Sequence, residues 1–169
     1  SPLNHKFKKE KSKLVLIGKT FGHLEQSCFL SENYSIDDGM PPEINFLNEK
    51  NNGEIVFKLI DKNLILSTHD ISNGGLITAL SEMAISSDYG ARIFKPKKLA
   101  NLFKYFFGED QARYVIEVEA NNLTKAEQIL KDNNIYYENI GFTQKEYFEI
   151  EGELKISTKD LFKLNNEWY

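Results

Sequence analysis

Short apolar runs and one helical pattern mark the first part of the chain. Residues 14–17 read Leu-Val-Leu-Ile and are followed by a glycine, which predicts a buried strand. Residues 27–32 are expected to form a short helix and residues 64–68 a second strand. Between residues 43 and 61 apolar side chains recur at helical spacing, but residues 51–53, Asn-Asn-Gly, are typical of a turn. Two helices, or one kinked helix, are therefore expected there.

The second part of the chain combines one clear helical stripe with alternating segments. Apolar residues between 76 and 84 share one helical face, and residues 113–119 alternate as a strand does. The remaining expected elements are a short strand at 91–94, a helix at 123–133, a strand at 136–142 paired with a strand at 147–150, and a closing helix at 160–168. This order predicts the α+β class, as a layered α/β/α domain around a mixed sheet.

The domain organisation is predicted to be simple. Residues 1–12 are expected to be a disordered or cloning-derived lead-in, and residues 13–169 a single domain cut from a larger enzyme. The first 13 residues are polar and basic, without the apolar core of a signal peptide, and no apolar run approaches the roughly 18 residues of a membrane span. These features predict a cytoplasmic protein without a membrane partner.

Charge and cysteine content narrow the function classes further. The formal net charge of -4 argues against a nucleic-acid binder, which would carry a strongly basic face. The single cysteine, Cys28, allows neither an intrachain disulfide nor a cysteine-based zinc site. The histidines are too scattered to predict a metal site, and the sequence contains no GxGxxG, GxxxxGK[ST], HExxH or GxSxG motif.

Residues 67–76 are the first candidate site, because a predicted strand there gives way to a predicted helix. The first turn of a helix has unpaired N–H groups and a positive dipole end, which attract phosphate. Gly74 and Gly75 permit close approach of a ligand or of another backbone. The alternative is a capped helix whose glycines serve packing. The segment also supplies two residues that could cap the helix, Ser72 and Asn73, and an acid–base or ion-binding pair, His69 and Asp70.

Two further segments are rich in hydrogen-bonding groups. Residues 18–27 follow the first strand and could wrap a phosphate with backbone amides, or serve only as a connection. Residues 107–113 read Phe-Gly-Glu-Asp-Gln-Ala-Arg and precede a strand. Adjacent acids with an arginine fit either a site or a salt-bridged turn.

Taken together, these segments occur in an order that is characteristic of one family. The segments are Leu14–Ile17, Gly18-x-Thr20-x-Gly22-His23-Leu24-x-Gln26-Ser27, Pro41-Pro42, Asn52-Gly53, His69-Asp70-Ile71-Ser72-x-Gly74-Gly75-Leu76, Ala79-Leu80-x-Glu82-Met83-Ala84 and Phe107-Gly108-Glu109-Asp110-Gln111-Ala112-Arg113. The chain resembles the final domain of the phosphoribosylformylglycinamidine synthases. More broadly, it is similar to the C-terminal domain of the aminoimidazole ribonucleotide synthetase superfamily, over roughly residues 14–118.

The resemblance implies a place in an ATP- and glutamine-dependent carbon–nitrogen ligase of de novo purine biosynthesis. Such an enzyme converts formylglycinamide ribonucleotide to formylglycinamidine ribonucleotide: ATP phosphorylates the formamide oxygen, and ammonia displaces the phosphate. ATP and magnesium are held largely by domains that this chain lacks. The implied partners are those remaining synthetase domains and a glutaminase subunit or domain. The fragment is expected to be inactive alone and to have no catalytic or metal-binding residue of its own.

The resemblance also implies roles for individual residues. His69 is expected to hydrogen-bond locally, and Glu109 and Arg113 to form pairs within the domain or with a neighbouring one. Glu25 departs from the family pattern, which has a glycine there, and its carboxylate would repel phosphate. The residues expected to face nucleotide or phosphate are Asp70, Ser72, Gly74, Gly75 and Ser27.

Two other functions remain open from the sequence. One is another ATP-dependent enzyme of the same superfamily, such as a thiamine-monophosphate kinase. The other is a non-enzymatic dimerisation or scaffold module, which would present a large apolar face to a second copy.

Overall fold

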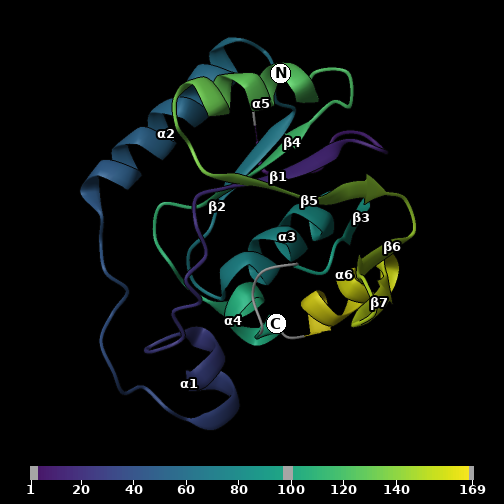
Figure 1. The fold of residues 1–169 in the computed structure, drawn as a ribbon. Helices are drawn as coiled ribbons and strands as arrows, with labels where there is room; N and C mark the ends of the chain where they lie inside the picture. The colour runs from purple at the N-terminus through teal and green to yellow at the C-terminus, as the bar shows by residue number, and fades with distance from the viewer. Residues whose placement is uncertain (1–3, 97–100, 168–169) are drawn as a thin grey trace.

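A single mixed sheet organises the computed structural model, which describes residues 4–96 and 101–167 (Figure 1). Over these residues the strand order is β2-β4-β1-β5-β3-β6-β7, and all neighbours are antiparallel except β3 and β6. The strands are β1 (Lys13–Ile17), β2 (Ser67–Asp70), β3 (Gly90–Ile93), β4 (Tyr114–Val118), β5 (Tyr137–Gln144), β6 (Tyr147–Ile150) and β7 (Leu154–Ser157). The predicted α+β class and mixed sheet are confirmed.

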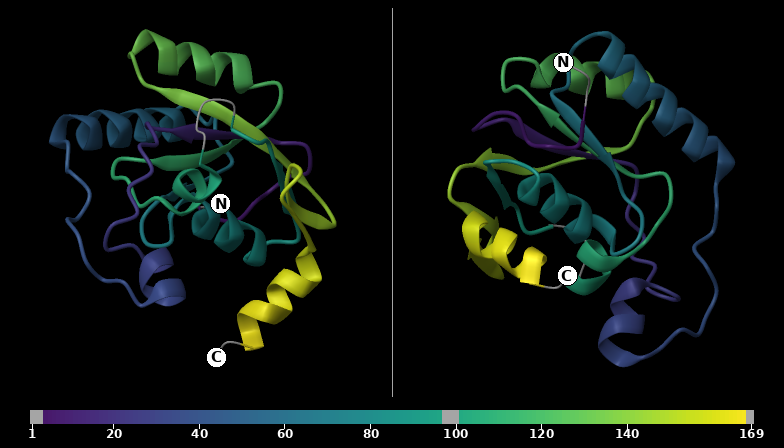
Figure 2. Two further views of the ribbon diagram at one scale, coloured as in Figure 1. Left: turned by 60° about the horizontal axis from the view of Figure 1, so that its bottom comes forward. Right: turned by 180° about the vertical axis from the view of Figure 1, so that it is seen from behind.

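Helices cover both faces of this sheet. Helices α2 and α5 lie together on one face, while α3, α4 and α6 lie on the other (Figures 1 and 2). Helix α1 lies beside α4, where the ring centroids of Phe29 and Phe107 are 4.6 Å apart, and a long connection joins it to α2 (Figure 2). The helices are α1 (Cys28–Tyr34), α2 (Phe46–Asp61), α3 (Gly75–Ile85), α4 (Leu102–Phe107), α5 (Leu123–Asp132) and α6 (Thr158–Glu167).

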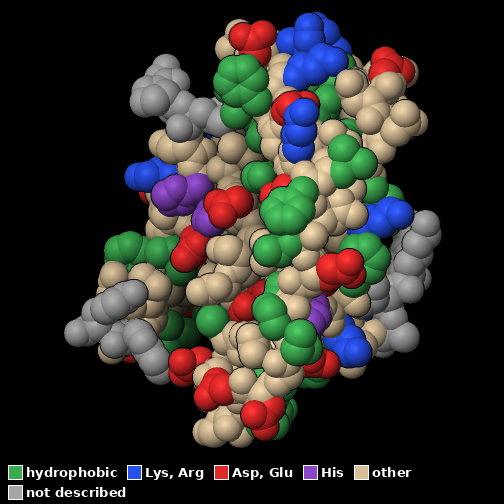
Figure 3. Space-filling view, turned by 90° about the vertical axis from the view of Figure 1, so that its left-hand side faces the viewer, with side chains coloured by type: hydrophobic (Ala, Val, Ile, Leu, Met, Phe, Trp, Pro, Cys, Tyr) green, Lys and Arg blue, Asp and Glu red, His purple; other side chains and the backbone are tan. Residues whose placement is uncertain are grey.

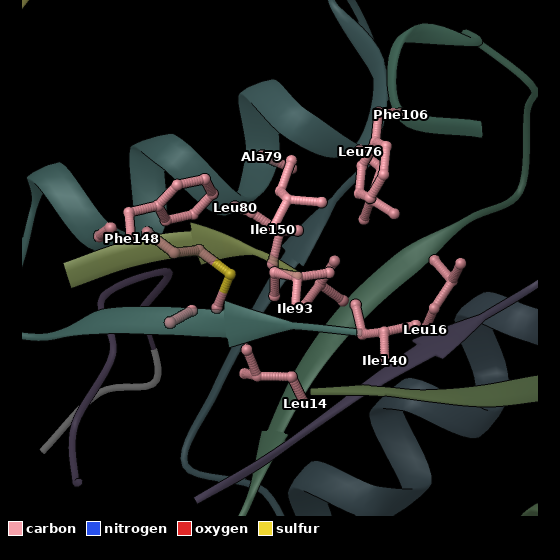
Figure 4. Close-up of a cluster of buried hydrophobic side chains, with 14 of the residues drawn as sticks. Leu14, Leu16, Leu76, Ala79, Leu80, Ile93, Phe106, Ile140, Phe148 and Ile150 are labelled. Atoms are coloured by element: carbon pink, nitrogen blue, oxygen red, sulfur yellow. The ribbon is translucent and has the colours of Figure 1, made fainter. Parts of the chain in front are cut away.

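The two helical layers enclose two separate hydrophobic cores. Successive side chains of a strand point to opposite faces, so β1 serves both cores. Leu14 and Leu16 pack towards α3 with Leu80 (Figure 4), whereas Val15 and Ile17 pack towards α2 and α5. The strand is buried on both faces, which explains why it reads as an uninterrupted apolar run.

Helix α2 corrects one prediction, because it runs unbroken through residues 51–53. Asn52 is 8% exposed, and its side-chain amide donates to the carbonyl oxygen of Ala112 at 2.8 Å. Gly53 lies beside the Tyr114 hydroxyl, which would be 3.6 Å from an added Cβ. The turn-like residues therefore serve contacts between α2 and the entry to β4.

Two strand predictions also need correction. Strand β2 begins at Ser67 rather than at residue 64, and Leu64 and Ile65 belong to a connection after α2 that is buried in the core beneath α2 and α5. Strand β6 pairs with β3 and β7, not with β5. The expected closing helix is present as α6, and Trp168, its predicted last residue, lies outside the described residues.

The segment before β1 packs against the domain over its described residues, 4–12. Phe7 is 2% exposed and belongs to the core around α3. The backbone N–H groups of Lys8 and Lys9 donate to the two carboxylate oxygens of Glu117 at 2.9 and 3.1 Å. At the outer edge of β2, the Thr68 N–H donates to the carbonyl oxygen of Asn4 at 3.4 Å. This segment therefore begins at the outer edge of β2 and ends beside β5, where the Lys11 N–H donates to the Thr143 carbonyl oxygen at 2.9 Å.

Candidate functional site

Sheet topology brings the three candidate segments to one edge. Strand β4 is antiparallel to both β1 and β2, so its beginning lies beside their ends: Tyr114 is opposite Ile17 and also opposite Asp70. The loop after β1, the segment after β2 and the loop before β4 consequently meet. This meeting point, residues 18–27, 71–75 and 108–113, is called the junction below.

The carboxylate of Asp110 is bound by three successive backbone amides of the loop after β1. Its Oδ2 accepts from the N–H groups of Phe21 and Gly22 at 3.0 and 2.9 Å, and its Oδ1 from that of His23 at 3.1 Å. Gly22 has a φ of +79°, and an added Cβ would lie 2.6 Å from the Cβ of Lys104. Successive amides of this kind form an anion-binding nest. The loop that was predicted to wrap an anion wraps a carboxylate of its own chain.

Arg113 neutralises this buried carboxylate. Arg113 is 1% exposed, and its Nη2 lies 3.9 Å from the Oδ2 of Asp110. The same Nη2 donates to the carbonyl oxygen of Gly108, while Nε donates to the carbonyl oxygen of Asp110 and Nη1 to the hydroxyl of Thr20. Burial lowers the pKa of Arg113, while the Asp110 carboxylate opposes that shift. The guanidinium is thus a buried charge whose donors bind both the loop after β1 and the loop before β4, and buried charges require such partners.

Glu109 joins the beginnings of two helices. Its Oε1 accepts from the N–H of Gly74, at the start of α3, at 2.7 Å and from the N–H of Cys28, the first residue of α1, at 2.8 Å. Helix starts have unpaired amides and a positive dipole end, so a carboxylate there is stabilising. The place where a phosphate was expected to lie at the start of α3 is taken by Glu109.

Neither Ser72 nor Asn73 caps α3 with its side chain, contrary to the prediction. Gly74 is the N-cap, with a φ of +76°, and has no side chain of its own to cap the helix. Ser72 instead contributes its carbonyl oxygen, which accepts from the Gly75 N–H at 3.1 Å. The conformation of Gly74 turns its amide towards Glu109, which replaces the expected serine or asparagine cap.

The residues expected to face a nucleotide divide into two groups. Asp70 and Ser72 are exposed. Gly75 is buried: an added Cβ would lie 2.7 Å from the carbonyl oxygens of Phe106 and Gly108, so this glycine lets α3 pack against the end of α4. Ser27 is 0% exposed, and its hydroxyl caps α1 by accepting from the Leu30 N–H at 3.4 Å.

His69 makes local contacts in the structure. Its Nδ1 lies 2.6 Å from the carbonyl oxygen of Asp70, and its Nε2 lies 2.9 Å from Oε2 of Glu82 on α3. Its ring meets that of His5 edge-on, with centroids 5.5 Å apart. These contacts link the end of β2 to α3 and to the segment before β1.

An open cleft of about 530 Å³ lies beside the Asp110 nest. Its lining includes Phe21, His23, Glu25, Asn48 and Lys104. Glu25 has a structural role that the sequence did not reveal: its Oε2 accepts from the Met40 N–H at 2.8 Å. The residue that departs from the family pattern therefore fixes the connection between α1 and α2.

The remaining chemistry of the described residues is limited. They contain no group of three or more His, Cys, Asp or Glu side chains placed to hold a metal ion. Cys28 is exposed at the start of α1. The pKa of its thiol is nevertheless raised, first by the burial that its surroundings provide and then by the Glu109 carboxylate. A raised pKa disfavours the nucleophilic thiolate. Across residues 4–96 and 101–167, no helix is both long enough and apolar enough to cross a membrane.

Sequence comparison identifies relatives along most of the chain. Residues 9–151 match the family described as AIR synthase related protein, C-terminal domain. Phosphoribosylformylglycinamidine synthase subunit PurL of Pelagibacter ubique is 46% identical over 155 residues, covering 92% of this chain and 21% of the relative. The same subunit of Rhodopseudomonas palustris strain TIE-1 is 36% identical over 162 residues, covering 96% of this chain and 22% of the relative. The chain thus spans about a fifth of the length of these curated relatives.

Solved structures share the fold. PurL of Thermotoga maritima complexed with FGAR has a TM-score of 0.81 at 15% identity, over 95% of this chain and 29% of that chain. The same protein complexed with ATP has a TM-score of 0.72 at 12% identity, over 95% of this chain and 27% of that chain. Because the family match covers residues 9–151 and the sheet is that of these structures, the chain belongs to the AIR synthase-related protein family and carries its C-terminal domain.

Proposed function

We propose that this chain works as the C-terminal domain of a phosphoribosylformylglycinamidine synthase. The whole enzyme would use ATP, magnesium and glutamine-derived ammonia to convert formylglycinamide ribonucleotide to formylglycinamidine ribonucleotide in the cytoplasm. Identities of 46% and 36% to PurL subunits support this assignment. Relatives about five times as long support a division of labour, in which other domains hold the reacting groups.

One observation carries the role proposed for this domain within the enzyme. The amides that would otherwise receive a phosphate donate to the carboxylates of Glu109 and Asp110. A phosphate beside either carboxylate would meet a like charge. The domain is therefore a structural module that flanks the nucleotide region rather than an autonomous binding site.

The segment after β2 is the part of the domain proposed to border bound nucleotide in the whole enzyme. Asp70 and Ser72 are exposed and would make the direct contacts. The buried residues of the predicted set, Gly75 and Ser27, would act by holding α3 and α1 in place. His69, Glu109 and Arg113 support the same segments from within the domain.

The partners are proposed to be the other synthetase domains and a glutaminase subunit. A solved structure from Thermotoga maritima is described as PurLQS, which supports an assembly that contains PurL. We extend that arrangement to the protein that contains this chain, because its relatives have the same subunit name.

The test compares this chain with the full-length protein. Isothermal titration with ADP and magnesium should give no binding to the folded 169-residue chain and clear binding to the full-length protein. The full-length protein with a glutaminase should form formylglycinamidine ribonucleotide from formylglycinamide ribonucleotide, ATP and glutamine. One-site nucleotide binding by the isolated chain would overturn the structural role, and a full-length protein without this activity would overturn the assignment.

A further inference from the structure

Residues 28–47, called the arm below, comprise α1, its connection to α2 and the first two residues of α2. The arm lies along one side of the molecule, and α1, at its beginning, packs against α4 through Phe29 and Phe107 (Figure 2). Phe46 is 80% exposed and Met40 is 72% exposed, so neither is buried by the domain itself. The large hydrophobic residues exposed along the arm are Tyr34, Ile36, Met40, Ile44, Phe46 and Leu47.

Hydrophobic side chains are exposed on the side of the molecule that carries the arm. Figure 3 views the side of the molecule where α2 and the arm lie, and hydrophobic side chains interspersed with acidic ones run down the middle of that face. Phe57 of α2 adds another exposed ring. Scattered exposed apolar residues are normal, but the concentration of large exposed apolar side chains within residues 34–47 is typical of an interaction surface.

The arm is held in a fixed path despite its exposure. At its middle, the Gln26 side chain donates to the Gly39 carbonyl oxygen at 2.8 Å, and Glu25 accepts from the Met40 N–H. At its beginning, Glu109 binds the Cys28 N–H, and near its end Asn45 caps α2 by accepting from the Asn48 N–H at 3.0 Å. An ordered backbone that presents apolar side chains loses little conformational freedom when it docks.

The acidic charge of the arm indicates which kind of partner surface it would bind. Between Lys19 and Lys50 the chain has no lysine or arginine. The acidic residues in that interval are Glu25, Glu32, Asp37, Asp38, Glu43 and Glu49. Complementary potential requires basic side chains around an apolar centre on the partner.

We propose that the arm docks onto an apolar, basic-rimmed surface of the remaining synthetase domains in the same polypeptide. Relatives of which this chain covers only 21–22% show that most of such a protein lies outside this chain and is available to cover the arm. The inference rests on the proposed function and adds the surface through which the domain joins the enzyme. It differs from the dimerisation alternative, in which a second copy would cover the same face.

Photo-crosslinking in the full-length protein tests the occupant. A benzophenone amino acid replaces Leu47, and in a matched control it replaces Phe162, an exposed aromatic residue on α6. The Leu47 position should yield crosslinks within one polypeptide, mapped by mass spectrometry to peptides outside residues 1–169. Crosslinked dimers would assign the face to a second copy and overturn the proposal. Absence of crosslinks at Leu47, or equal yields to the same peptides from both positions, would also overturn it.

Charge reversal tests the proposed basic rim. Replacing Asp37→Lys and Asp38→Lys together should reduce the Leu47 crosslink yield several-fold, and raising the salt concentration should reduce the wild-type yield in the same direction. An exposed control, Asp160→Lys on α6, should leave the yield unchanged. An unchanged yield after reversal at 37 and 38 would overturn the basic rim.

Activity of the same full-length protein separates the two proposals. If the protein forms formylglycinamidine ribonucleotide but the arm does not crosslink within its own chain, the docking proposal fails and the proposed function stands. If the arm crosslinks as expected but the reaction is absent, the interface stands and the assigned reaction fails.

Discussion

The carboxylates of Glu109 and Asp110, adjacent in sequence, bind two separate sets of backbone amides. Glu109 accepts from the first amides of α1 and α3, and Asp110 from three amides of the loop after β1. Residues far apart in sequence are thereby connected through a single dipeptide. The junction is consequently held together by anions that belong to the chain.

Removing the Asp110 carboxylate should destabilise the domain strongly. In Asp110→Ala, three amides lose their acceptor and the buried Arg113 loses its counter-charge, so the free energy of unfolding should fall by about 3–5 kcal/mol. Urea unfolding of the 169-residue chain measures this change. Asp110→Asn keeps an acceptor oxygen and should lose less, and Asp88→Ala at an exposed site should change stability by under about 0.5 kcal/mol. Equal stabilities of Asp110→Ala and Asp88→Ala would contradict the nest.

Removing the Glu109 carboxylate should loosen the starts of two helices simultaneously. Glu109→Ala is expected to reduce stability by about 0.5–2 kcal/mol, the range for loss of a helix cap. Hydrogen exchange should accelerate at the amides of both Gly74 and Cys28, because both donate to the same oxygen. Faster exchange at one of these amides without the other would show that the carboxylate does not join the two helices.

The buried carboxyl group of Glu117 should make the stability of the domain depend on pH. Burial raises the pKa of Glu117, although bonds from Ser67 and from the backbone at Lys8 oppose the shift. A raised folded-state pKa means that the folded protein binds the proton more tightly than the unfolded chain. The contribution to stability is therefore full below the unfolded pKa and is lost as the pH rises through the folded pKa.

Comparison with Glu117→Gln isolates this contribution, because glutamine does not titrate. The stability of the wild type minus that of Glu117→Gln should be largest near pH 4 and should decrease as the pH rises towards neutrality. Urea unfolding of both proteins across this range supplies the difference. A difference that stays constant, or that increases with pH, would contradict the raised pKa.

Two glycines with similar backbone conformations provide a matched test of the α3–α4 contact. Gly75 and Gly152 have φ values of +72° and +74°, but only Gly75 has backbone atoms against its missing side chain, and Gly152 has nothing within 4 Å. Gly75→Asp should cost about 2–5 kcal/mol through strain and overpacking. Gly152→Asp should cost about 1 kcal/mol, because only the left-handed backbone is penalised. Thermal unfolding of both variants measures the contrast, and equal losses would argue against the contact.

The strands and helices that pack into the cores could be predicted because burial is visible in the sequence. Leu14–Ile17 and the stripe from Leu76 to Ala84 contribute largely buried side chains, so their patterns match the elements. Strand β7 and helix α4 were missed: none of the four residues of β7 is buried, and α4 has six residues. Neither is long enough or regular enough to produce a clear period.

The location of the junction could be predicted, but not its occupants. Strand ends and glycines identified the segments at residues 18–27, 67–76 and 107–113. The identity of the acceptors depends on contacts across long sequence separations, such as that between Gly22 and Asp110, 88 positions apart. A local pattern identifies unpaired amides but does not indicate which distant carboxylate reaches them.

The segment before β1 has a consequence for how this domain can assemble. The Asn4 carbonyl oxygen accepts from an outward N–H of the edge strand β2, and the opposite edge strand, β7, has four residues with Lys155 among them. Short, covered or charged edges are poor templates for strand addition. The sheet is therefore protected from extension by another molecule, and stable association is left to side-chain surfaces. Aggregation through edge-to-edge pairing should correspondingly require detachment of Asn4 from β2.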